Sequence, residues 1–378
     1  DKTIEGQSIT PVLNNLIRND SIYFSNYYEQ VGWGNTSDAE FISHNSFYPS
    51  TKTFSYKAFE ENDFFTLPSM LKDIGYTTIA FHGNEGTFWN REAIYPAQGI
   101  DTFISLEKLK EDEMVGIGLS DGSLFRQSIE ILKGLNQPFY SFFVTLTSHH
   151  PFIMQDRHKA LKIGDEYQDT ILGDYLQTIH YFDKELGNFI KKLKQENLYD
   201  NSIIIIYGDH EGLDMRDEET NELLSSFLDK PYKEDEMFKV PFIVHIPGSG
   251  IKKELLTAGG QIDFFPTIAN LMGLRLEANR IMGKDLLNTK QGFVAKQVHL
   301  IQGSFIDNDK IFIMSKDGIF ENSRAWNLHT GEPISLEECQ EGYERALAEI
   351  NLSEYTMQNN LINIVKEKGL EYILELYQ

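Results

Sequence analysis

Short apolar runs alternate with longer amphipathic stretches along this chain, and this alternation limits the possible folds more than any other feature. The clearest run is residues 202–207 (SIIIIY), which has the β-branched composition of a buried strand and polar residues on both sides. Similar runs lie at residues 77–81, 139–146 and 240–246. Strands that alternate with helix-length stretches predict an α/β fold, with a mixed, mainly parallel sheet sandwiched by helices.

Two helices are indicated between and after these strands. Apolar side chains in residues 169–194 recur with the 3.6-residue period of an amphipathic helix, among them Leu172, Leu176, Ile179, Leu186 and Leu193. Residues 263–271 predict another helix, with Pro266 in the first turn, where proline is tolerated. Residues 214–236 are charged and aperiodic, so we expect a mobile surface loop there.

Near the C-terminus the pattern changes to short strand-like segments broken by turn residues, at residues 299–301 and 310–314. Residues 336–375 then have a mostly helical pattern. We therefore expect two parts, a large α/β domain in residues 1–290 and a small antiparallel subdomain with terminal helices in residues 291–378.

The charge balance limits the partners of this protein. Lys and Arg number 34 against 57 Asp and Glu, which gives a net charge of −23. Nucleic-acid binding depends on basic side chains that displace counterions from phosphates, so we expect no nucleic-acid partner. The same charge gives no general attraction to an anionic membrane, so any contact with lipid is expected to be local or imposed by a tether.

Cysteine content and hydropathy leave the compartment open. Cys339 is the only cysteine, which excludes an intrachain disulfide. No run reaches the roughly 18 apolar residues of a membrane span. The chain opens with Asp1-Lys2-Thr3, in what has the pattern of the middle of a loop, so we expect a fragment whose signal or membrane anchor lies upstream.

Polar residues follow two of the predicted strands at their carboxyl ends, where ligands bind in open α/β sheets. Asp209 and His210 follow residues 202–207 and offer one oxygen and one nitrogen to a metal, although Gly-Asp turns after strands are common anyway. His149 follows residues 139–146 in the same way and can bind metal, carry protons or donate to phosphate, or be a loop histidine without a role. Both alternatives stay open, but histidines from two strands at one sheet edge favour a site.

A third strand ends at His82, and the next loop contains Trp89 and Arg91. A guanidinium can bind a phosphate through two hydrogen bonds, and an indole offers a flat apolar wall to a small polyol. The alternative is an aromatic loop that covers the core, with Arg91 in a surface ion pair.

Thr36 lies at an expected helix start, where Ser37 and Glu40 have the spacing of a capping box. Backbone N–H groups at such a position favour anions. A metal ion could lower the pKa of the Thr36 hydroxyl enough to make it a nucleophile, a role that Thr36 alone would not justify.

Taken in order, these motifs resemble the lipoteichoic acid synthase family, within the alkaline phosphatase and sulfatase superfamily. The GNTSDAEF and HGN…FWNR pieces are specific to the family, whereas the GDH and PTI pieces occur across the superfamily. The matching pieces are TPVLNNL (10–16), NYYEQVGWGNTSDAEF (26–41), FHGNEGTFWNR (81–91), PFYSFFVTLTSHHPF (138–152), YGDHEG (207–212), QIDFFPTIANLMGL (261–274) and MGKDLL (282–287).

The resemblance implies an alkaline phosphatase-like fold and transfer of glycerol phosphate from phosphatidylglycerol to a glycolipid or a growing polyglycerol phosphate chain. It implies that Thr36 is the nucleophile and a metal ligand, with Asp209 and His210 as further ligands. The implied metal is Mn²⁺, with Mg²⁺ or Zn²⁺ as substitutes. The implied place of work is the outer face of the membrane of a Gram-positive-type bacterium. The residues that it implies for the glycerol phosphate pocket are His82, Trp89, Arg91 and His149, the last also as a catalytic residue.

One departure from the family pattern concerns the metal. The family takes another ligand from a Glu at the end of a first strand, upstream of residues 10–16, and Glu5 is in the wrong place to replace it. His150 also stands where the family often has an aromatic residue.

Four other functions compete with this one. A sulfatase needs a C/S-x-P-S-R motif, which is absent, and Cys339 is far from every motif. A phosphoethanolamine transferase also uses a Thr and a metal, but the FWNR loop argues against it. A primase that adds only the first glycerol phosphate stays open, as does a non-catalytic domain that binds lipid headgroup or polymer.

Overall fold

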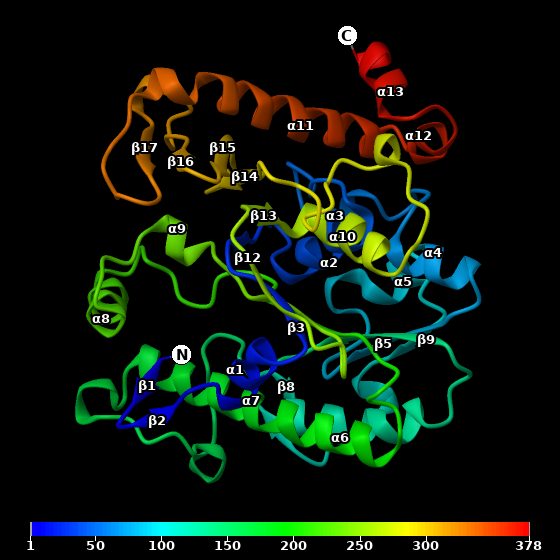
Figure 1. The fold of residues 1–378 in the computed structure, drawn as a ribbon, viewed down its shortest axis with the longest axis vertical. Coiled ribbons are helices and arrows are strands. Elements are labelled where there is room, and N and C mark those ends of the chain that lie inside the picture. Colours follow the sequence, from blue (N-terminus) through cyan, green and yellow to red (C-terminus); the bar gives the residue numbers. More distant parts are fainter. Residues whose placement is uncertain (1, 378) are drawn as a thin grey trace.

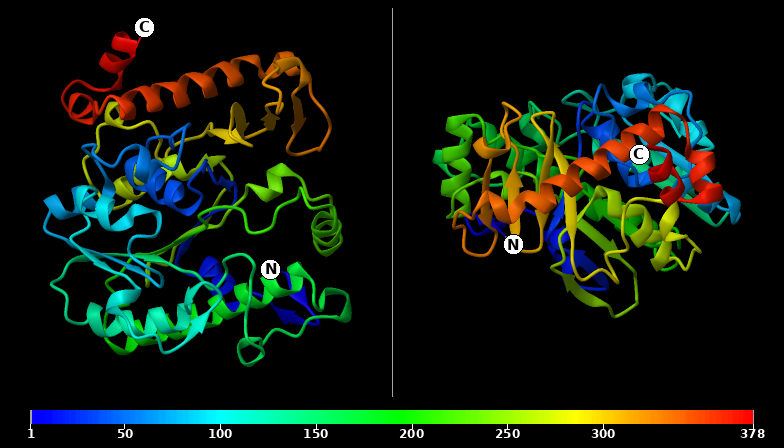
Figure 2. Two further views of the ribbon diagram at one scale, coloured as in Figure 1. Left: turned by 180° about the vertical axis from the view of Figure 1, so that it is seen from behind. Right: turned by 90° about the horizontal axis from the view of Figure 1, so that it is seen from above.

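The computed structural model describes residues 2–377, in which helices cover both faces of a central layer of strands (Figure 1). Helices α6 (Asp121–Leu132) and α7 (Ile171–Gln195) pack together on one face, next to α1 (Pro11–Arg18). The view from behind shows the same layers (Figure 2). The helices on the opposite face are α2 (Thr36–Asn45), α3 (Ser55–Ala58), α4 (Leu67–Asp73), α5 (Arg91–Ala97) and α10 (Phe264–Leu271).

One part of the strand layer is parallel, as expected. Strand β5 (Thr77–His82) lies between β6 (Thr102–Ile104) and β9 (Phe139–Val144), and both pairings are parallel. In this register His82 pairs with Val144, so β5 and β9 end at the same edge. The apolar runs at 77–81 and 139–146 thus form neighbouring strands.

The other part is mixed, with the order β10-β11-β3-β12. Strand β11 (Phe242–His245) pairs antiparallel with both β10 (Ile204–Tyr207) and β3 (Ser21–Phe24). Strand β12 (Lys252–Leu255) pairs parallel with β3. The sheet is therefore mixed, as the sequence predicts, but less parallel than expected, because two of the three pairings in this part are antiparallel.

Helix α7 confirms the helix predicted from apolar periodicity. Thr170 caps it by accepting a hydrogen bond from the N–H of Gly173. The stripe that faces the core is buried and includes Leu172, Leu176, Leu186, Ile190 and Leu193.

The prediction of a mobile loop at 214–236 is wrong. This segment forms α8 (Glu218–Leu228) and the short α9 (Glu234–Met237). Asp217 caps α8 by accepting from the N–H of Thr220, and Leu224 is buried against α7. Helix α8 buries only a narrow apolar stripe, and most of its other residues are charged or polar. Its apolar residues are therefore too few to show a helical period in the sequence.

The C-terminal part is an antiparallel sheet with helices across it, as predicted. Its strands follow one another in the sheet: β14 (Phe293–Val298), β15 (Ile301–Asp307), β16 (Lys310–Ile313) and β17 (Arg324–Asn327). Helix α11 (Gln340–Gln358) packs on β14 and β15, and α12 (Ile362–Lys368) and α13 (Leu370–Tyr377) follow.

In the C-terminal part, the strand expected at residues 299–301 differs from the structure, and the domain boundary that we expect at residues 290 and 291 stays a prediction. His299 and Leu300 form the turn between β14 and β15, so the strand expected at 299–301 is a turn in its first two residues, and only Ile301 belongs to a strand, as the first residue of β15. A single apolar cluster joins Phe41 of α2 to Phe305 of β15 and Ile350 of α11. The division at residues 290 and 291 remains our proposal.

Short elements complete the chain, and no helix within residues 2–377 is long and apolar enough to cross a membrane. The short strands are β1 (Thr3–Ile4), β2 (Gln7–Ser8), β4 (Tyr27–Tyr28), β7 (Met114–Val115), β8 (Gly118–Leu119) and β13 (Gly259–Gly260). The 3₁₀ turns are η1 (Phe88–Asn90), η2 (Leu106–Lys108), η3 (Asp156–His158), η4 (Asp165–Tyr167), η5 (Gln261–Asp263), η6 (Ala278–Arg280), η7 (Phe320–Asn322) and η8 (Leu336–Cys339).

Candidate active site

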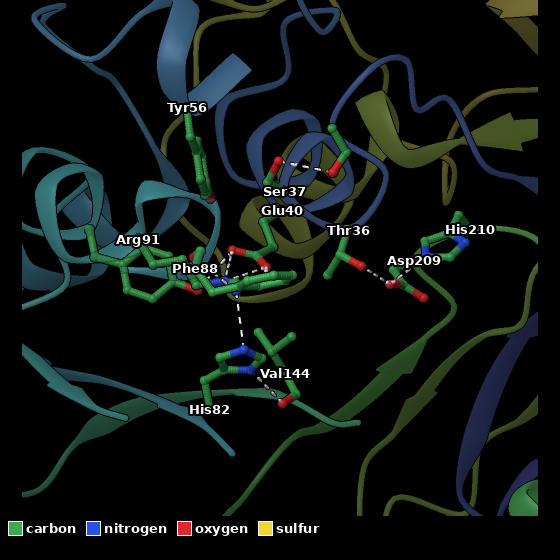
Figure 3. A network of polar contacts seen from close by, with 12 residues as sticks. Thr36, Ser37, Glu40, Tyr56, His82, Phe88, Arg91, Val144, Asp209 and His210 are labelled. Carbon is green, nitrogen blue, oxygen red and sulfur yellow. Dashed lines mark hydrogen bonds and ion pairs between the residues drawn. The ribbon is translucent and has the colours of Figure 1, made fainter. Parts of the chain in front are cut away.

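The hydroxyl of Thr36 meets the carboxylate of Asp209 although the two residues are 173 positions apart. Thr36 is the first residue of α2, and Asp209 follows the end of β10. Thr36 Oγ1 donates to Asp209 Oδ2 over 2.8 Å, and His210 Nε2 lies 3.4 Å from the same oxygen (Figure 3). Two ligands of one ion lie within roughly 4 to 5 Å of each other. The structure thus brings together the three residues predicted as metal ligands.

Asp38 fixes the loop that delivers Thr36. One carboxylate oxygen of Asp38 accepts the N–H groups of Gly32 and Gly34, and the other accepts the N–H and hydroxyl of Ser55. Gly34 has no room for a side chain, since a Cβ there would lie 2.6 Å from Asp38 Oδ1. The position of Thr36 therefore depends on a buried carboxylate that sequence reasoning did not single out.

The capping box predicted from Ser37 and Glu40 is wrong. The helix begins two residues earlier than a cap at Ser37 requires, with Asn35 as the N-cap residue, and the Asn35 side chain makes no capping bond. Ser37 Oγ donates to the carbonyl of Gly34, and Glu40 binds Arg91 instead of the helix terminus. The sequence pattern assigned Glu40 to the helix cap, but its carboxylate forms an ion pair with Arg91, which is distant in the sequence.

The surroundings of Asp209 favour positive charge. Burial raises the pKa of Glu211, and the neighbouring Glu29 raises it further. Burial acts to lower the pKa of His210, but the carboxylates of Asp209 and Glu211 outweigh it and hold that pKa above its usual value. A cation at this point would meet the carboxylates of Asp209 and Glu211, with Lys296 close enough to Glu211 to offset part of its charge.

The donors present fit a divalent cation. They are the Asp209 carboxylate, the His210 imidazole and the Thr36 hydroxyl, set in acidic surroundings. Within residues 2–377, no three His, Cys, Asp or Glu side chains are grouped closely enough to hold a metal. The hydroxyl of Thr36 is the third donor that lies beside Asp209 and His210.

Arg91 forms a buried ion pair with Glu40, and both side chains are at most 2% exposed. Arg91 Nη2 donates to Glu40 Oε1 over 2.7 Å and Arg91 Nε donates to the same oxygen over 3.0 Å. Tyr95 donates its hydroxyl to the other Glu40 oxygen over 2.8 Å. The sequence left open a surface ion pair for Arg91, and the structure shows that its ion pair is buried in the core. Most N–H groups of the Arg91 guanidinium already donate to protein acceptors.

His82 is neutral, and its tautomer follows from its partners. Arg91 Nη1 lies 3.2 Å from His82 Nε2, and a guanidinium can only donate, so Nε2 accepts. The hydrogen is then on Nδ1, which donates to the carbonyl of Val144 over 3.2 Å. Burial, and then the charge of Arg91, lowers the pKa of His82 to about 3. A histidine with both nitrogens engaged and this pKa does not carry protons near neutral pH.

Helix α2 joins these two groups of residues. Thr36 and Glu40 are four positions apart and lie on one face, one turn after the other. Figure 3 shows Arg91 and His82 on one side of this turn and Asp209 with His210 on the other. The ion pair thus positions the end of β5 against the helix that carries Thr36.

The loop after β5 is strained. Trp89 and Asn90 have φ values of 57° and 62°, in the left-handed region that bulky side chains avoid. The Trp89 ring packs edge-on against Phe54 and Phe88, with centroids 5.1 and 5.6 Å away. Backbone strain of this kind gathers at functional sites, because the surrounding structure must enforce it.

His149 is exposed and lies beyond the end of β9. Its Nδ1 is 2.6 Å from the carbonyl of His150, which can only accept, so Nδ1 carries the hydrogen. Nε2 is then the nitrogen that faces away from this contact and can take or give a proton.

A cavity of about 330 Å³ adjoins the Thr36 group rather than the His82 group. Asn35 and Glu211, the neighbours of Thr36 and His210, line one side, and residues of the C-terminal sheet line the other. At its base Lys296 forms a buried ion pair with Glu29, 267 positions away. His82, Trp89, Arg91 and His149 are not among its lining residues, so the predicted pocket and this cavity are different places.

The sulfatase family model matches residues 3–274. The chain belongs to the sulfatase family. Superfamily members are generally metal-dependent. This sulfatase-family chain is similar to curated lipoteichoic acid synthase proteins of Bacillus subtilis (strain 168). It is 36% identical over 371 residues to the lipoteichoic acid synthase-like YvgJ, covering 96% of this chain and 58% of that protein. It is 32% identical over 382 residues to lipoteichoic acid synthase 2, covering 99% and 56%. The chain therefore spans little more than half the length of these relatives.

Among solved structures, the sulfatase-family chain is similar to the lipoteichoic acid synthase LtaP from Listeria monocytogenes. The TM-score is 0.87 at 29% identity, over 94% of this chain and 88% of that one. This similarity confirms the predicted fold, which is like that of alkaline phosphatases and sulfatases. It also confirms the resemblance to the lipoteichoic acid synthase family that the sequence motifs indicate.

Proposed function

We propose that this chain is the catalytic domain of a phosphoglycerol transferase that builds lipoteichoic acid through a covalent intermediate on Thr36. The observation that carries the proposal is the Thr36 hydroxyl at a helix start, hydrogen-bonded to Asp209 beside His210. The similarity to lipoteichoic acid synthases supports the donor phosphatidylglycerol and an acceptor that is a glycolipid or polyglycerol phosphate.

Thr36, Asp209 and His210 would hold the metal, with Mn²⁺ preferred and Mg²⁺ or Zn²⁺ as substitutes, since the donor set is mixed and mostly hard. A divalent cation bound there supplies charge that lowers the pKa of a hydroxyl and offsets the phosphoryl oxygens.

In the first half of the reaction, Thr36 Oγ1 attacks the phosphorus of the lipid headgroup. The Oγ–P bond forms, the bond from phosphorus to the diacylglycerol oxygen breaks, and diacylglycerol leaves with a proton. The Thr36 hydrogen bond supports this step, because its hydrogen is directed at Asp209 and the opposite side of the oxygen is left for the metal and for phosphorus.

In the second half, a terminal hydroxyl of the acceptor attacks the same phosphorus. The bond from Thr36 Oγ1 to phosphorus breaks, the new phosphodiester forms, and the proton that the acceptor hydroxyl loses replaces the one that Thr36 gave up in the first half. We assign the transfer of this proton to His149 Nε2, because both ring nitrogens of His82 already have partners.

His82, Trp89 and Arg91 would shape the place where the glycerol phosphate group binds. The strained backbone of Trp89 supports a binding role for the indole. Arg91 has most of its donors on Glu40, so we assign it first to hold His82 and the loop, and to reach a phosphoryl oxygen only with the remaining hydrogen. The domain would work on the outer face of a Gram-positive-type membrane, held there by an anchor outside this chain.

The test uses the full-length protein and phosphatidylglycerol labelled in the headgroup glycerol. We expect mass spectrometry to find glycerol phosphate on the peptide that contains Thr36. Thr36→Ala should lose diacylglycerol release, whereas Thr36→Ser should retain part of it and become labelled on Ser. Normal release of diacylglycerol by Thr36→Ala would refute the covalent mechanism. Transfer of a different headgroup by the unmutated protein would refute the substrate assignment only.

A further inference from the structure

Two adjoining cavities lie along the C-terminal sheet. The first, of about 330 Å³, begins at Asn35 and Glu211, the sequence neighbours of Thr36 and His210, which do not line it themselves. The second, of about 300 Å³, lies farther along, at the connection from β16 to β17. His299, Lys316 and Arg324 line both, so the two cavities form one continuous depression. We call this depression the basic trough.

The basic trough is unusual in a chain of net charge −23. The second cavity has no carboxylate among its lining residues, which are His299, Ile313, Met314, Ser315, Lys316, Asn322 and Arg324. Three carboxylates line the first cavity beside its cations: Glu234 pairs with Arg324, Glu29 pairs with Lys296, and Glu211 lies at the end next to His210. The basic character of the trough therefore lies mainly in its second cavity. Lys316 is exposed and makes no ion pair within residues 2–377. The charge of Lys316 is thus available to a ligand.

The turn that projects into the trough is strained. His299 and Leu300 have φ values of 50° and 67° in the two-residue connection of β14 and β15. Such turns normally use Asn-Gly, because both positions need a left-handed backbone. Residues held in this conformation without glycine persist only where the surrounding structure enforces them, and they cluster at active sites and ligand clamps. The side chains at this tip are therefore retained at a conformational cost.

A buried amide adds a second, independent observation. Gln297 is 6% exposed and lines the first cavity, and its side-chain Oε1 has no hydrogen-bond partner among residues 2–377. Such an atom normally has a partner when buried. A hydroxyl group from a ligand would satisfy it. The trough thus offers cations for phosphates and a buried amide for a polyol hydroxyl.

We propose that the basic trough binds the acceptor, a chain of glycerol units joined by phosphodiesters, and directs its terminal hydroxyl toward Thr36. Lys316, His299 and Arg324 contact successive phosphates, and Gln297 contacts a glycerol hydroxyl near the nucleophile. This inference rests on the proposed function and adds the place and chemistry of acceptor binding.

The concave shape favours a polymer strand over a lipid surface. Cations that dock a membrane lie on an open, convex or flat face, where each one reaches the anionic headgroups. Here the cations line cavities and the surrounding protein is acidic. A single strand of phosphodiesters can enter such a trough, whereas a bilayer cannot.

The first test compares Lys316→Glu with Lys290→Glu, which makes the same charge change at an exposed lysine of the same region outside both cavities. Binding of synthetic glycerol phosphate oligomers is measured by calorimetry on the full-length protein. We expect Lys316→Glu to weaken the Kd about tenfold, with a larger loss for longer oligomers, and Lys290→Glu to leave it unchanged. Equal binding by both variants would overturn the proposal.

The second test replaces the strained turn by His299→Asn with Leu300→Gly. We expect a higher melting temperature, since the backbone strain is relieved, together with weaker oligomer binding and shorter polymer products. A variant that is more stable and binds oligomer as before would overturn a role for the turn. If Lys316→Glu instead loses binding to phosphatidylglycerol vesicles and keeps oligomer binding, the trough is a lipid site and the acceptor assignment is wrong. Absence of diacylglycerol release by the unmutated protein would refute the proposed function but leave the oligomer result interpretable.

Discussion

Replacing Glu40 by Ala should destabilise the protein more than any surface ion-pair change. The variant leaves the Arg91 guanidinium buried at 1% exposure without its carboxylate. Breaking a buried pair in this way costs about 3 to 5 kcal/mol, because an uncompensated charge stays in the core. Tyr95 also loses the acceptor of its hydroxyl, which adds about 1 kcal/mol. The expected loss is therefore about 4 to 6 kcal/mol of a total stability of about 5 to 15.

The assay is urea unfolding followed by circular dichroism, with Glu60→Ala as the matched control. Glu60 pairs with Lys57 on the surface, 3.2 Å away, with both side chains more than one third exposed. Such a pair contributes less than about 1 kcal/mol, so the control should unfold almost as the unmutated protein does.

A double variant separates the buried charge from other effects. Glu40→Ala combined with Arg91→Met removes both charges and fills part of the space with an apolar side chain. We expect it to recover much of the lost stability, since a buried ion pair and its apolar replacement differ little. The reasoning is refuted if Glu40→Ala costs no more than Glu60→Ala, or if the double variant is as unstable as the single one.

Two further changes test the site. Asp209→Asn should abolish Mn²⁺ binding measured by calorimetry, and with it diacylglycerol release, while the melting temperature without metal stays within a few degrees. Full activity of this variant, or activity after exhaustive chelation, would contradict the metal assignment. His82→Gln should change the pH dependence of stability. The pKa of His82 is lowered to about 3 in the fold, so this residue contributes stability above pH 6.5 and loses it as the pH falls. The stability difference between the unmutated protein and the variant should shrink below pH 6.5 by up to about 1.4 kcal/mol per pH unit in urea titrations. A constant difference from pH 7.5 to 5 would show that His82 is not held neutral.

The strands could be predicted because their signal is local. A run such as residues 202–207 is apolar over the whole length of β10, although all four residues of this strand are partly rather than fully buried, contrary to the expectation of a buried strand. The amphipathic period of α7 is equally local. The order of strands in the sheet was not predictable in detail, because strand pairing depends on contacts between distant segments of the chain. The pairing of β11 with β3, for example, joins residues more than 200 positions apart.

The site was only partly predictable for the same reason. Thr36, Asp209 and His210 lie at ends of elements, where a sequence pattern can place them. Glu40 was assigned to a cap because its true partner, Arg91, is 51 positions away. Its spacing of four from Thr36 was the signal that could have found it, since this spacing puts both on one helix face.

The basic trough could not be found from composition, because a count of charges averages over the whole surface. At physiological ionic strength, exposed charges act over about 8 Å, so a polyanion responds to the residues that it touches rather than to the net charge of −23. Away from the trough those residues are mostly acidic and repel a phosphodiester chain. Inside it, Lys316 offers a cation and His299 a ring that can donate a hydrogen bond, along a path that ends at Asn35, the neighbour of Thr36. An acidic surface with one basic path thus orients a polyanionic substrate by repulsion as much as by attraction, and added salt should weaken both effects together.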